Sequence, residues 1–177
     1  MSKPRLKVEY MSWSSIVEAV AWLSKKIATQ YKPDLIVAIA KGGLIPARIL
    51  ADILGIEDLG YIEVKFYKSI GSTLEKPFIK TMALQSIVDK NVLVVDDIVD
   101  SGRTMQLVVN VLSNLGARTV KSAALYVKPW STYTPDYYYK VVTSWIVFPW
   151  EVCEVLKEGV SIDHSEFKKL VDYCVVK

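Results

Sequence analysis

The chain has 177 residues, with 51% hydrophobic and 23% charged side chains, which are the proportions of a globular domain and exclude extensive disorder. Its formal net charge of +3 is too small to predict non-specific nucleic-acid binding, and its apolar runs are far shorter than the roughly 18 residues that a membrane span needs. Because no apolar core of a secretion signal stands near its start, we expect one soluble, cytoplasmic domain that binds neither nucleic acid nor membrane.

Hydrophobic periodicity predicts alternating helices and strands along the chain. The expected elements, in order, are a helix over residues 15–29, a strand over 35–40, a helix over 46–54, strands over 61–67 and 92–95, a helix over 103–115, strands over 120–127 and 137–146, and a short helix over 149–157. Ser15 and Glu18 have capping-box spacing at the start of the first helix. The runs 35–40, 92–95 and 120–127 are unbroken and apolar, which is typical of strands covered on both faces. We therefore expect an α/β fold with a central parallel sheet flanked by helices.

Residues 68–80 differ from their neighbours, because Gly71, Ser72, Thr73 and Pro77 give them loop chemistry. A loop of this length in a compact domain is often a lid. Two interpretations stay open: a mobile lid over a bound ligand, and an ordinary surface loop.

Polar residues gather at the ends of two predicted strands, where ligands bind in α/β sheets. The first group is Ala40, Lys41, Gly42 and Gly43, and the second is Asp96, Asp97, Asp100, Ser101, Gly102, Arg103 and Thr104. The second group opens a helix, whose free backbone N–H groups favour a phosphate, although it lacks the Walker pattern. Asp96 and Asp97 suit hydroxyl groups and Mg²⁺, so we infer a phosphorylated sugar with free hydroxyls as the ligand. The alternatives are a helix-capping group at the second strand end and a plain strand-to-helix turn at the first.

The segment VLVVDDIVDSGRT, residues 92–104, resembles the phosphoribosyl-pyrophosphate (PRPP) motif of the type I phosphoribosyltransferases. Residues 39–55, 125–138 and 144–151 are similar to bacterial xanthine-guanine phosphoribosyltransferases and related 6-oxopurine enzymes, in the same order along the chain. The resemblance implies transfer of the 5-phosphoribosyl group of PRPP to N9 of a purine base: hypoxanthine, guanine or xanthine. Mg²⁺ is the implied cofactor, and pyrophosphate and a nucleoside 5′-monophosphate are the implied products.

The resemblance also implies a role for each group of residues. Residues 40–43 form the pyrophosphate loop, with a cis peptide bond before Lys41, and residues 100–104 bind the 5′-phosphate. Asp96 and Asp97 hold the ribose hydroxyls. The implied base site is Lys128, Trp145, Ile146 and Glu151, and the implied metal ligands are Asp96, Asp97 and Glu151.

The chemistry of the side chains supports these roles. Lys41 and the amides of Gly42 and Gly43 can stabilise charge on the leaving pyrophosphate, and the two glycines allow backbone conformations closed to other residues. Asp100 can accept the purine N7 proton while N9 attacks, or it can cap the next helix. Lys128 can donate a hydrogen bond to a 6-oxo group, which adenine lacks, or it can be an ordinary surface lysine.

The aromatic residues also allow two interpretations. Trp145 offers a stacking surface and Ile146 offers backbone groups to a purine, although aromatic residues more often lie in the core. We interpret Trp130, Tyr133 and the tyrosines at 137–139 as packing or as a subunit interface.

The remaining expectations concern the whole chain. Cys153 and Cys174 are expected as free thiols, because two distant cysteines and a single histidine favour neither a disulfide scaffold nor a zinc site. His164 is expected at the surface.

One domain, residues 1–177, is expected to have a core over residues 10–128 and a small base-binding hood from residues 128–160 with the N-terminal residues. By resemblance we expect a homo-oligomer, a dimer or a tetramer; the alternative functions are a regulatory protein of this fold that senses PRPP or a nucleotide, and a phosphoribosyltransferase for another base.

Overall fold

The computed structural model describes residues 7–68, 75–162 and 164–174. Its helices are α1 (Trp13–Gln30), α2 (Leu44–Leu54), α3 (Arg103–Asn114), α4 (Val152–Lys157) and α5 (Lys168–Val171). Its strands are β1 (Val8–Tyr10), β2 (Leu35–Ala40), β3 (Leu59–Lys68), β4 (Glu75–Ala83), β5 (Asn91–Val99), β6 (Thr119–Val127), β7 (Tyr137–Val141) and β8 (Trp145–Val147). The chain forms two compact units, a larger one over residues 18–142 and a smaller one over residues 1–17 and 143–177.

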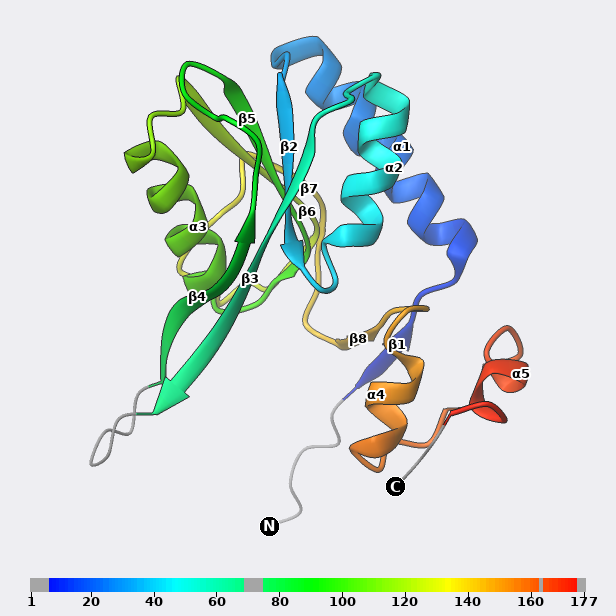
Figure 1. Ribbon diagram of the computed structural model, residues 1–177. Coiled ribbons are helices and arrows are strands. Elements are labelled where there is room, and N and C mark those ends of the chain that lie inside the picture. The colour runs from blue at the N-terminus through cyan, green and yellow to red at the C-terminus, as the bar shows by residue number, and fades with distance from the viewer. Residues whose placement is uncertain (1–6, 69–74, 163, 175–177) are drawn as a thin grey trace. The chain divides into compact units, whose positions relative to one another are not determined.

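The larger unit is built on a six-stranded sheet in the order β4-β3-β2-β5-β6-β7. Every neighbouring pair is parallel except β3 with β4, which confirms the expected α/β fold with a central parallel sheet. Helices α1 and α2 lie on one side of this sheet and α3 lies on the other (Figure 1). Strands β2 and β5 are neighbours in the middle, with Ala38 opposite Val95.

Both faces of the central strands are buried, as their unbroken apolar runs predict. Alternate residues of a strand point to opposite faces, and Leu35, Val37 and Ile39 form one core cluster with residues of α3. The residues between them, Ile36 and Ala38, are also fully buried, because α1 and α2 cover the opposite face.

The smaller unit contains a two-stranded parallel sheet of β1 and β8, in which Glu9 pairs with Ile146. The single strand expected over residues 137–146 is therefore wrong, since β7 pairs with β6 whereas β8 pairs with β1. The chain leaves the first sheet between the two strands, and there the Ser144 hydroxyl donates a hydrogen bond to Glu9 at 2.6 Å.

The N-cap residue of the first helix is Ser12 and not Ser15, so the capping box predicted from Ser15 and Glu18 is wrong. Ser12 stands before the helix, and its Oγ accepts the backbone N–H of Ser15 at 3.1 Å. This is the bond of an N-cap residue to the third helical residue.

Within the loop expected over residues 68–80, Lys68 belongs to β3 and residues 75–80 belong to β4, so this part of the prediction is wrong. Strand β4 runs antiparallel to β3, with Pro77 opposite Phe66, and it is an edge strand of the sheet. Proline has no N–H to donate, and an edge strand tolerates it because one side of the strand has no neighbour. Of the predicted lid, residues 69–74 lie outside the described residues.

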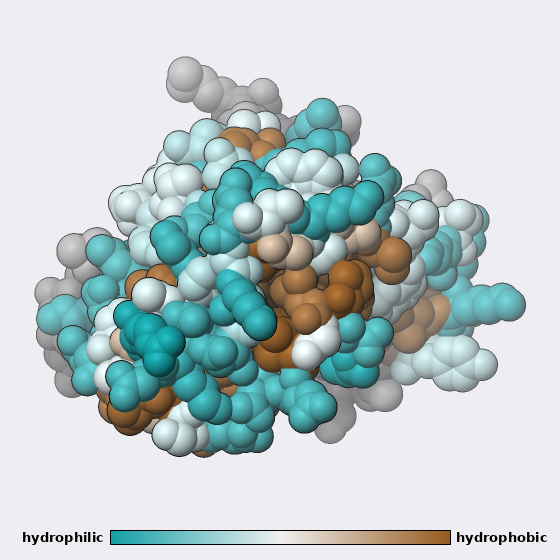
Figure 2. All heavy atoms as spheres, turned by 90° about the horizontal axis from the view of Figure 1, so that it is seen from above, coloured by the Kyte–Doolittle hydropathy of each residue, from teal (hydrophilic) through white to brown (hydrophobic). Residues whose placement is uncertain are grey.

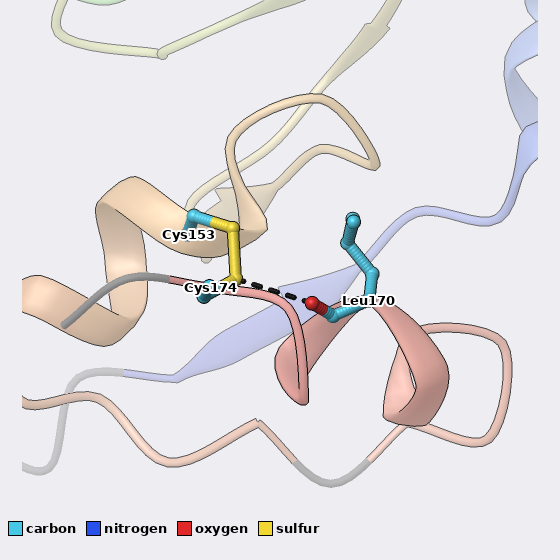
Figure 3. The surroundings of a disulfide bond; sticks show 3 residues. All are labelled: Cys153, Leu170 and Cys174. Atoms are coloured by element: carbon cyan, nitrogen blue, oxygen red, sulfur yellow. Dashed lines mark hydrogen bonds between the residues drawn. A yellow bond between two sulfur atoms is a disulfide. The ribbon is translucent and has the colours of Figure 1, made fainter.

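The cysteines do not remain free thiols, because Cys153 and Cys174 form a disulfide (Figure 3). Their Cα atoms lie 5.4 Å apart although 21 positions separate them in the sequence. No local pattern in the sequence predicts that the two cysteines meet. The disulfide joins α4 to the segment that follows α5. No helix in the described part of the chain is long and apolar enough to cross a membrane.

Candidate active site

The two polar strand ends meet at one edge of the sheet, because β2 and β5 are parallel neighbours. Gly42 lies against the Asp97 carboxylate so closely that a Cβ on Gly42 would overlap it. A Cβ on Gly43 would stand 2.5 Å from the Val95 carbonyl oxygen on β5. Glycine is thus required here by close approach to the neighbouring strand end, which a plain strand-to-helix turn would not need.

The backbone of this loop matches one expectation and corrects another. The peptide bond between Ala40 and Lys41 is cis, as the resemblance implies. Gly42 and Gly43 are not among the glycines with positive φ, and Gly43 has φ −64° at the start of α2. The expectation that these glycines supply a special backbone conformation is therefore wrong, and space alone explains them.

Asp96 and Asp97 lie within β5, which runs on to Val99 and is longer than the predicted strand over residues 92–95, and their carboxylates turn toward backbone amides. Asp96 Oδ1 accepts the N–H of Asp97 at 3.0 Å, and Asp97 Oδ1 accepts the N–H of Ile98 at 2.8 Å. Burial raises the pKa of Asp96 well above its usual range, and the neighbouring Asp97 carboxyl raises it further. A cation or a set of hydroxyl donors at this pair would relieve the repulsion between them.

A cavity of about 170 Å³ lies where β5 passes into α3. Its lining residues are Phe66, Asp96, Ile98, Val99, Asp100, Ser101, Gly102, Thr104 and Met105. Gly102 stands at the N-terminus of α3 with φ +84°, a left-handed conformation that favours glycine. The cavity therefore opens on the N-terminus of a twelve-residue helix, a position where backbone N–H groups and the helix dipole favour a phosphate.

Phe66 belongs to this cavity although nothing in its sequence context predicts a place there. It comes from β3, two strands away from β5, and the guanidinium carbon of Arg103 lies 5.5 Å from its ring centroid. An exposed aromatic residue in an alternating strand has no signature that separates it from ordinary packing, so only the fold reveals it.

Asp100, Trp130 and Lys128 form a connected group beside the cavity. The Trp130 indole Nε1 donates a hydrogen bond to Asp100 Oδ1 at 2.7 Å, and Lys128 Nζ lies 5.3 Å from the centroid of the Trp130 ring. Lys128 is only 6% exposed, so it is not an ordinary surface lysine. Gly102, not Asp100, occupies the cap position of α3, so the capping role for Asp100 is also wrong.

The segment after β6 is attached to the turn before α3 by backbone and side-chain bonds. The backbone N–H of Thr132 donates to the Ser101 carbonyl oxygen at 3.1 Å, and the Thr132 hydroxyl donates to the same oxygen at 2.8 Å. Ser131 Oγ would stand 2.7 Å from a Cβ on Gly102. Gly102 therefore allows this close approach as well as the left-handed turn.

The other predicted base-site residues belong to the smaller unit. Trp145 is 43% exposed and Ile146 is buried, and Trp145 donates its backbone N–H to the Lys7 carbonyl oxygen at 2.7 Å. Glu151 Oε1 accepts the N–H of Phe148 at 3.0 Å, so this carboxylate stabilises the turn over residues 148–151. The sequence prediction that these residues bind a base stays a prediction.

His164 is not the surface residue that its polar surroundings suggest. Its ring packs against Phe167 with centroids 4.7 Å apart and against Tyr10 at 6.0 Å.

Among the residues that the structure describes, no group of three or more His, Cys, Asp or Glu side chains is placed to hold a metal ion. Asp96 and Asp97 are thus a pair of candidate ligands, which suits a Mg²⁺ ion that takes its other ligands from substrate and water.

Fold and site together define an α/β protein with a polar cavity at the carboxyl edge of its parallel sheet. The Phosphoribosyl transferase domain family matches residues 9–155 of the chain. The xanthine-guanine phosphoribosyltransferase of Ruegeria sp. (strain TM1040) is 32% identical over 164 residues, covering 84% of this chain and 88% of that protein. The enzyme of the same name from Gluconobacter oxydans (strain 621H) is 30% identical over 144 residues, covering 80% and 83%. The chain belongs to the phosphoribosyl transferase domain family.

Solved structures show the same relationship. A purine phosphoribosyltransferase from Pyrococcus horikoshii Ot3 is 39% identical with a TM-score of 0.77, covering 90% of this chain and 99% of that one. A hypothetical protein from Neisseria gonorrhoeae, solved with bound ppGpp, is 26% identical with a TM-score of 0.76, covering 97% and 99%.

Proposed function

We propose that this protein is a purine salvage phosphoribosyltransferase that joins the 5-phosphoribosyl group of PRPP to N9 of a 6-oxopurine and releases pyrophosphate. One observation carries the proposal. The loop that contains Lys41 and Gly42 lies directly against Asp97, beside a cavity at the N-terminus of α3. A charged loop, a carboxylate pair and a phosphate cradle thus stand together, as PRPP with its pyrophosphate, hydroxyls and 5′-phosphate requires.

Each part of PRPP has residues of suitable chemistry. The backbone N–H groups at the start of α3 and the hydroxyls of Ser101 and Thr104 suit the 5′-phosphate. Asp96 and Asp97 suit the ribose hydroxyls. The Lys41 ammonium and the amide of Gly42 would stabilise the negative charge that grows on pyrophosphate as it leaves.

Asp96 and Asp97 also fit a Mg²⁺ ion, because their mutual repulsion and the burial of Asp96 favour a cation beside them. Bound there, Mg²⁺ would supply positive charge to the pyrophosphate oxygens. Glu151 is proposed as a further contact to the metal or pyrophosphate.

The transfer itself makes and breaks one bond at the anomeric carbon. The N9 electron pair forms the new bond to C1′, the bond from C1′ to the pyrophosphate oxygen breaks, and its electrons leave with pyrophosphate. The proton on the purine N7 passes to the Asp100 carboxylate. The Lys128 ammonium donates a hydrogen bond to the 6-oxo group, whereas the adenine amino group offers it no acceptor. Trp145 and Ile146 are proposed to complete the base site.

The purified protein, supplied with PRPP, Mg²⁺ and radiolabelled hypoxanthine, guanine, xanthine or adenine, tests the proposal. We expect the nucleoside 5′-monophosphates of 6-oxopurines, and loss of product when EDTA is added. Product from adenine alone would contradict the 6-oxopurine assignment, and no product from any base would contradict the transfer reaction.

A second candidate function, nucleotide sensing without catalysis, is favoured by the similarity to a structure solved with ppGpp. Calorimetric titration with ppGpp, with and without PRPP, separates the two candidates. Tight ppGpp binding by a protein that turns over no base would support the sensor, whereas turnover of a 6-oxopurine supports the enzyme.

A further inference from the structure

We propose that Trp130 is a positioning residue for this transfer reaction, which orients the Asp100 carboxylate with its indole N–H and holds the Lys128 ammonium with its ring face. The inference rests on the proposed function. It assigns a role in the reaction to a residue whose sequence context suggests packing or a subunit interface.

The bond to Asp100 is short and has one direction. An indole N–H can only donate, and its 2.7 Å separation from Asp100 Oδ1 is typical of a bond to a charged acceptor. Asp100 is itself exposed, so its side chain has several rotamers open to it without this bond. With Oδ1 engaged by the indole, Oδ2 is the oxygen that receives the purine proton, and the indole proton stays on nitrogen.

The ring of Trp130 contacts the second functional side chain. Lys128 Nζ lies 5.3 Å from the ring centroid, within the about 6 Å over which a cation is attracted to an aromatic face. Because Lys128 is almost fully buried, its ammonium has lost most of its water, and the ring provides part of the compensation. The Trp130 side chain therefore contacts both Asp100, the proposed proton acceptor, and Lys128, the proposed donor to the base, and fixes their separation.

Trp130 can serve in this way because the backbone on either side of it is fixed. The N–H of Lys128 donates to the Val99 carbonyl oxygen at 2.9 Å, and the N–H of Ser131 donates to the Lys128 carbonyl oxygen at 3.0 Å. Thr132 then makes its two bonds to Ser101. A Trp side chain that is 56% exposed contributes little to a core, so its two polar contacts are the better explanation of its place.

Two substitutions separate the contacts. Trp130→Phe keeps an aromatic face for Lys128 and removes the N–H, whereas Trp130→Leu removes both. Trp22→Phe is the matched control, because Trp22 is also about half exposed and also lies near a lysine, with Lys26 Nζ 5.4 Å from its ring centroid.

We expect Trp130→Phe to lower kcat about tenfold or more, the loss typical of a hydrogen bond to a charged group, with an unchanged KM for PRPP. Trp130→Leu should also raise the KM for hypoxanthine and guanine. Trp22→Phe should change neither constant, and the thermal midpoints of Trp130→Phe and Trp22→Phe should match that of the wild type.

A double-mutant cycle with Asp100→Asn, measured by kcat, distinguishes a positioning role for Trp130 from a purely structural one. If Trp130 acts through Asp100, Trp130→Phe causes little further loss of kcat once Asp100 is Asn. Losses that multiply in the double variant, or a wild-type kcat in Trp130→Phe, would overturn the positioning role while leaving the proposed function intact. A wild-type protein that turns over no base would instead overturn the proposed function, and the positioning role with it.

Discussion

Gly42 shows how one missing side chain lets two loops share a site. A Cβ at this position would overlap the Asp97 carboxylate, so Gly42→Ala must displace either the loop or the carboxylate. We predict a KM for PRPP raised by at least tenfold, measured by initial rates at saturating base. Gly55→Ala is the control, because Gly55 has φ +66° and open space around it. An alanine there should lower the stability of the protein and leave the KM for PRPP unchanged. Equal effects of the two variants on KM would contradict the close-approach argument.

Lys128 tests the choice of base. Lys128→Met keeps most of the buried side-chain volume and removes the donor, so we predict a loss of about 1.5 to 3 kcal/mol in transition-state stabilisation for hypoxanthine and guanine. Adenine, whose 6-amino group offers no acceptor to the ammonium, should show no comparable loss. Steady-state kcat/KM values for the three bases decide the matter, and an equal loss for all three would remove Lys128 from the selection of the base.

At the scale of single elements, β3 contributes to a site that lies mainly on β5. Phe66 lines the cavity at the start of α3 and contacts the Arg103 guanidinium, an aromatic contact to a cation worth about 0.5 to 1 kcal/mol at an exposed position. We predict that Phe66→Ala raises the KM for PRPP about two- to fivefold. Phe78→Ala is the control, since Phe78 has the same 40% exposure as Phe66 and lies on β4 of the same hairpin. A KM unchanged by Phe66→Ala would contradict its place in the cavity wall.

The disulfide constrains the segment that follows α4. It closes a loop between residues separated by 21 positions, and the Cys174 sulfur also lies 3.4 Å from the Leu170 carbonyl oxygen (Figure 3). We predict that Cys153→Ser lowers the free energy of unfolding of the smaller unit by about 2 to 4 kcal/mol, measured by denaturant titration. Dithiothreitol should destabilise the wild type to a similar extent and leave Cys153→Ser unaffected; a variant as stable as the oxidised wild type would show that the disulfide contributes nothing.

Local sequence patterns predict the elements that local physics determines. The runs that became β2, β5 and β6 are apolar on both faces, so their burial could be inferred from composition alone. Strand β4 could not, because an edge strand with Pro77 and exposed lysines has the same composition as a loop. For the same reason Trp130, whose contacts join two loops, could not be distinguished from a packing residue.

Long-range pairing accounts for the other differences. The motif around Asp96 and Gly102 is continuous in the sequence and was sufficient to infer a phosphate cradle. The partner of β8 is β1, near the opposite end of the chain, and Cys153 likewise meets a cysteine that no local pattern connects to it. Contacts of this kind depend on the completed fold.

For the whole molecule we predict a homo-oligomer, as the resemblance implies. Figure 2 shows hydrophobic side chains gathered in a patch on a face that is otherwise largely hydrophilic. Ile53 on α2 and Tyr61 on β3 are each more than a third exposed, and exposed hydrophobic side chains of this kind are candidates for contact with a second copy. Light scattering should give the mass of a dimer or tetramer, and Ile53→Glu should lower it, whereas a wild-type monomer at all concentrations would contradict the prediction.

The parallel pairing of β1 with β8 bears on the order in which the protein is made and folded. The larger unit, residues 18–142, is continuous in the chain, so its contacts are all available before the last residues leave the ribosome. Strand β1 emerges first yet must wait for residues 145–147, its partners in the sheet. Domains generally form as their sequence becomes available during synthesis, so β1 is translated before the larger unit yet reaches its final place after it. Deleting either β1 or β8 would therefore remove the same small sheet.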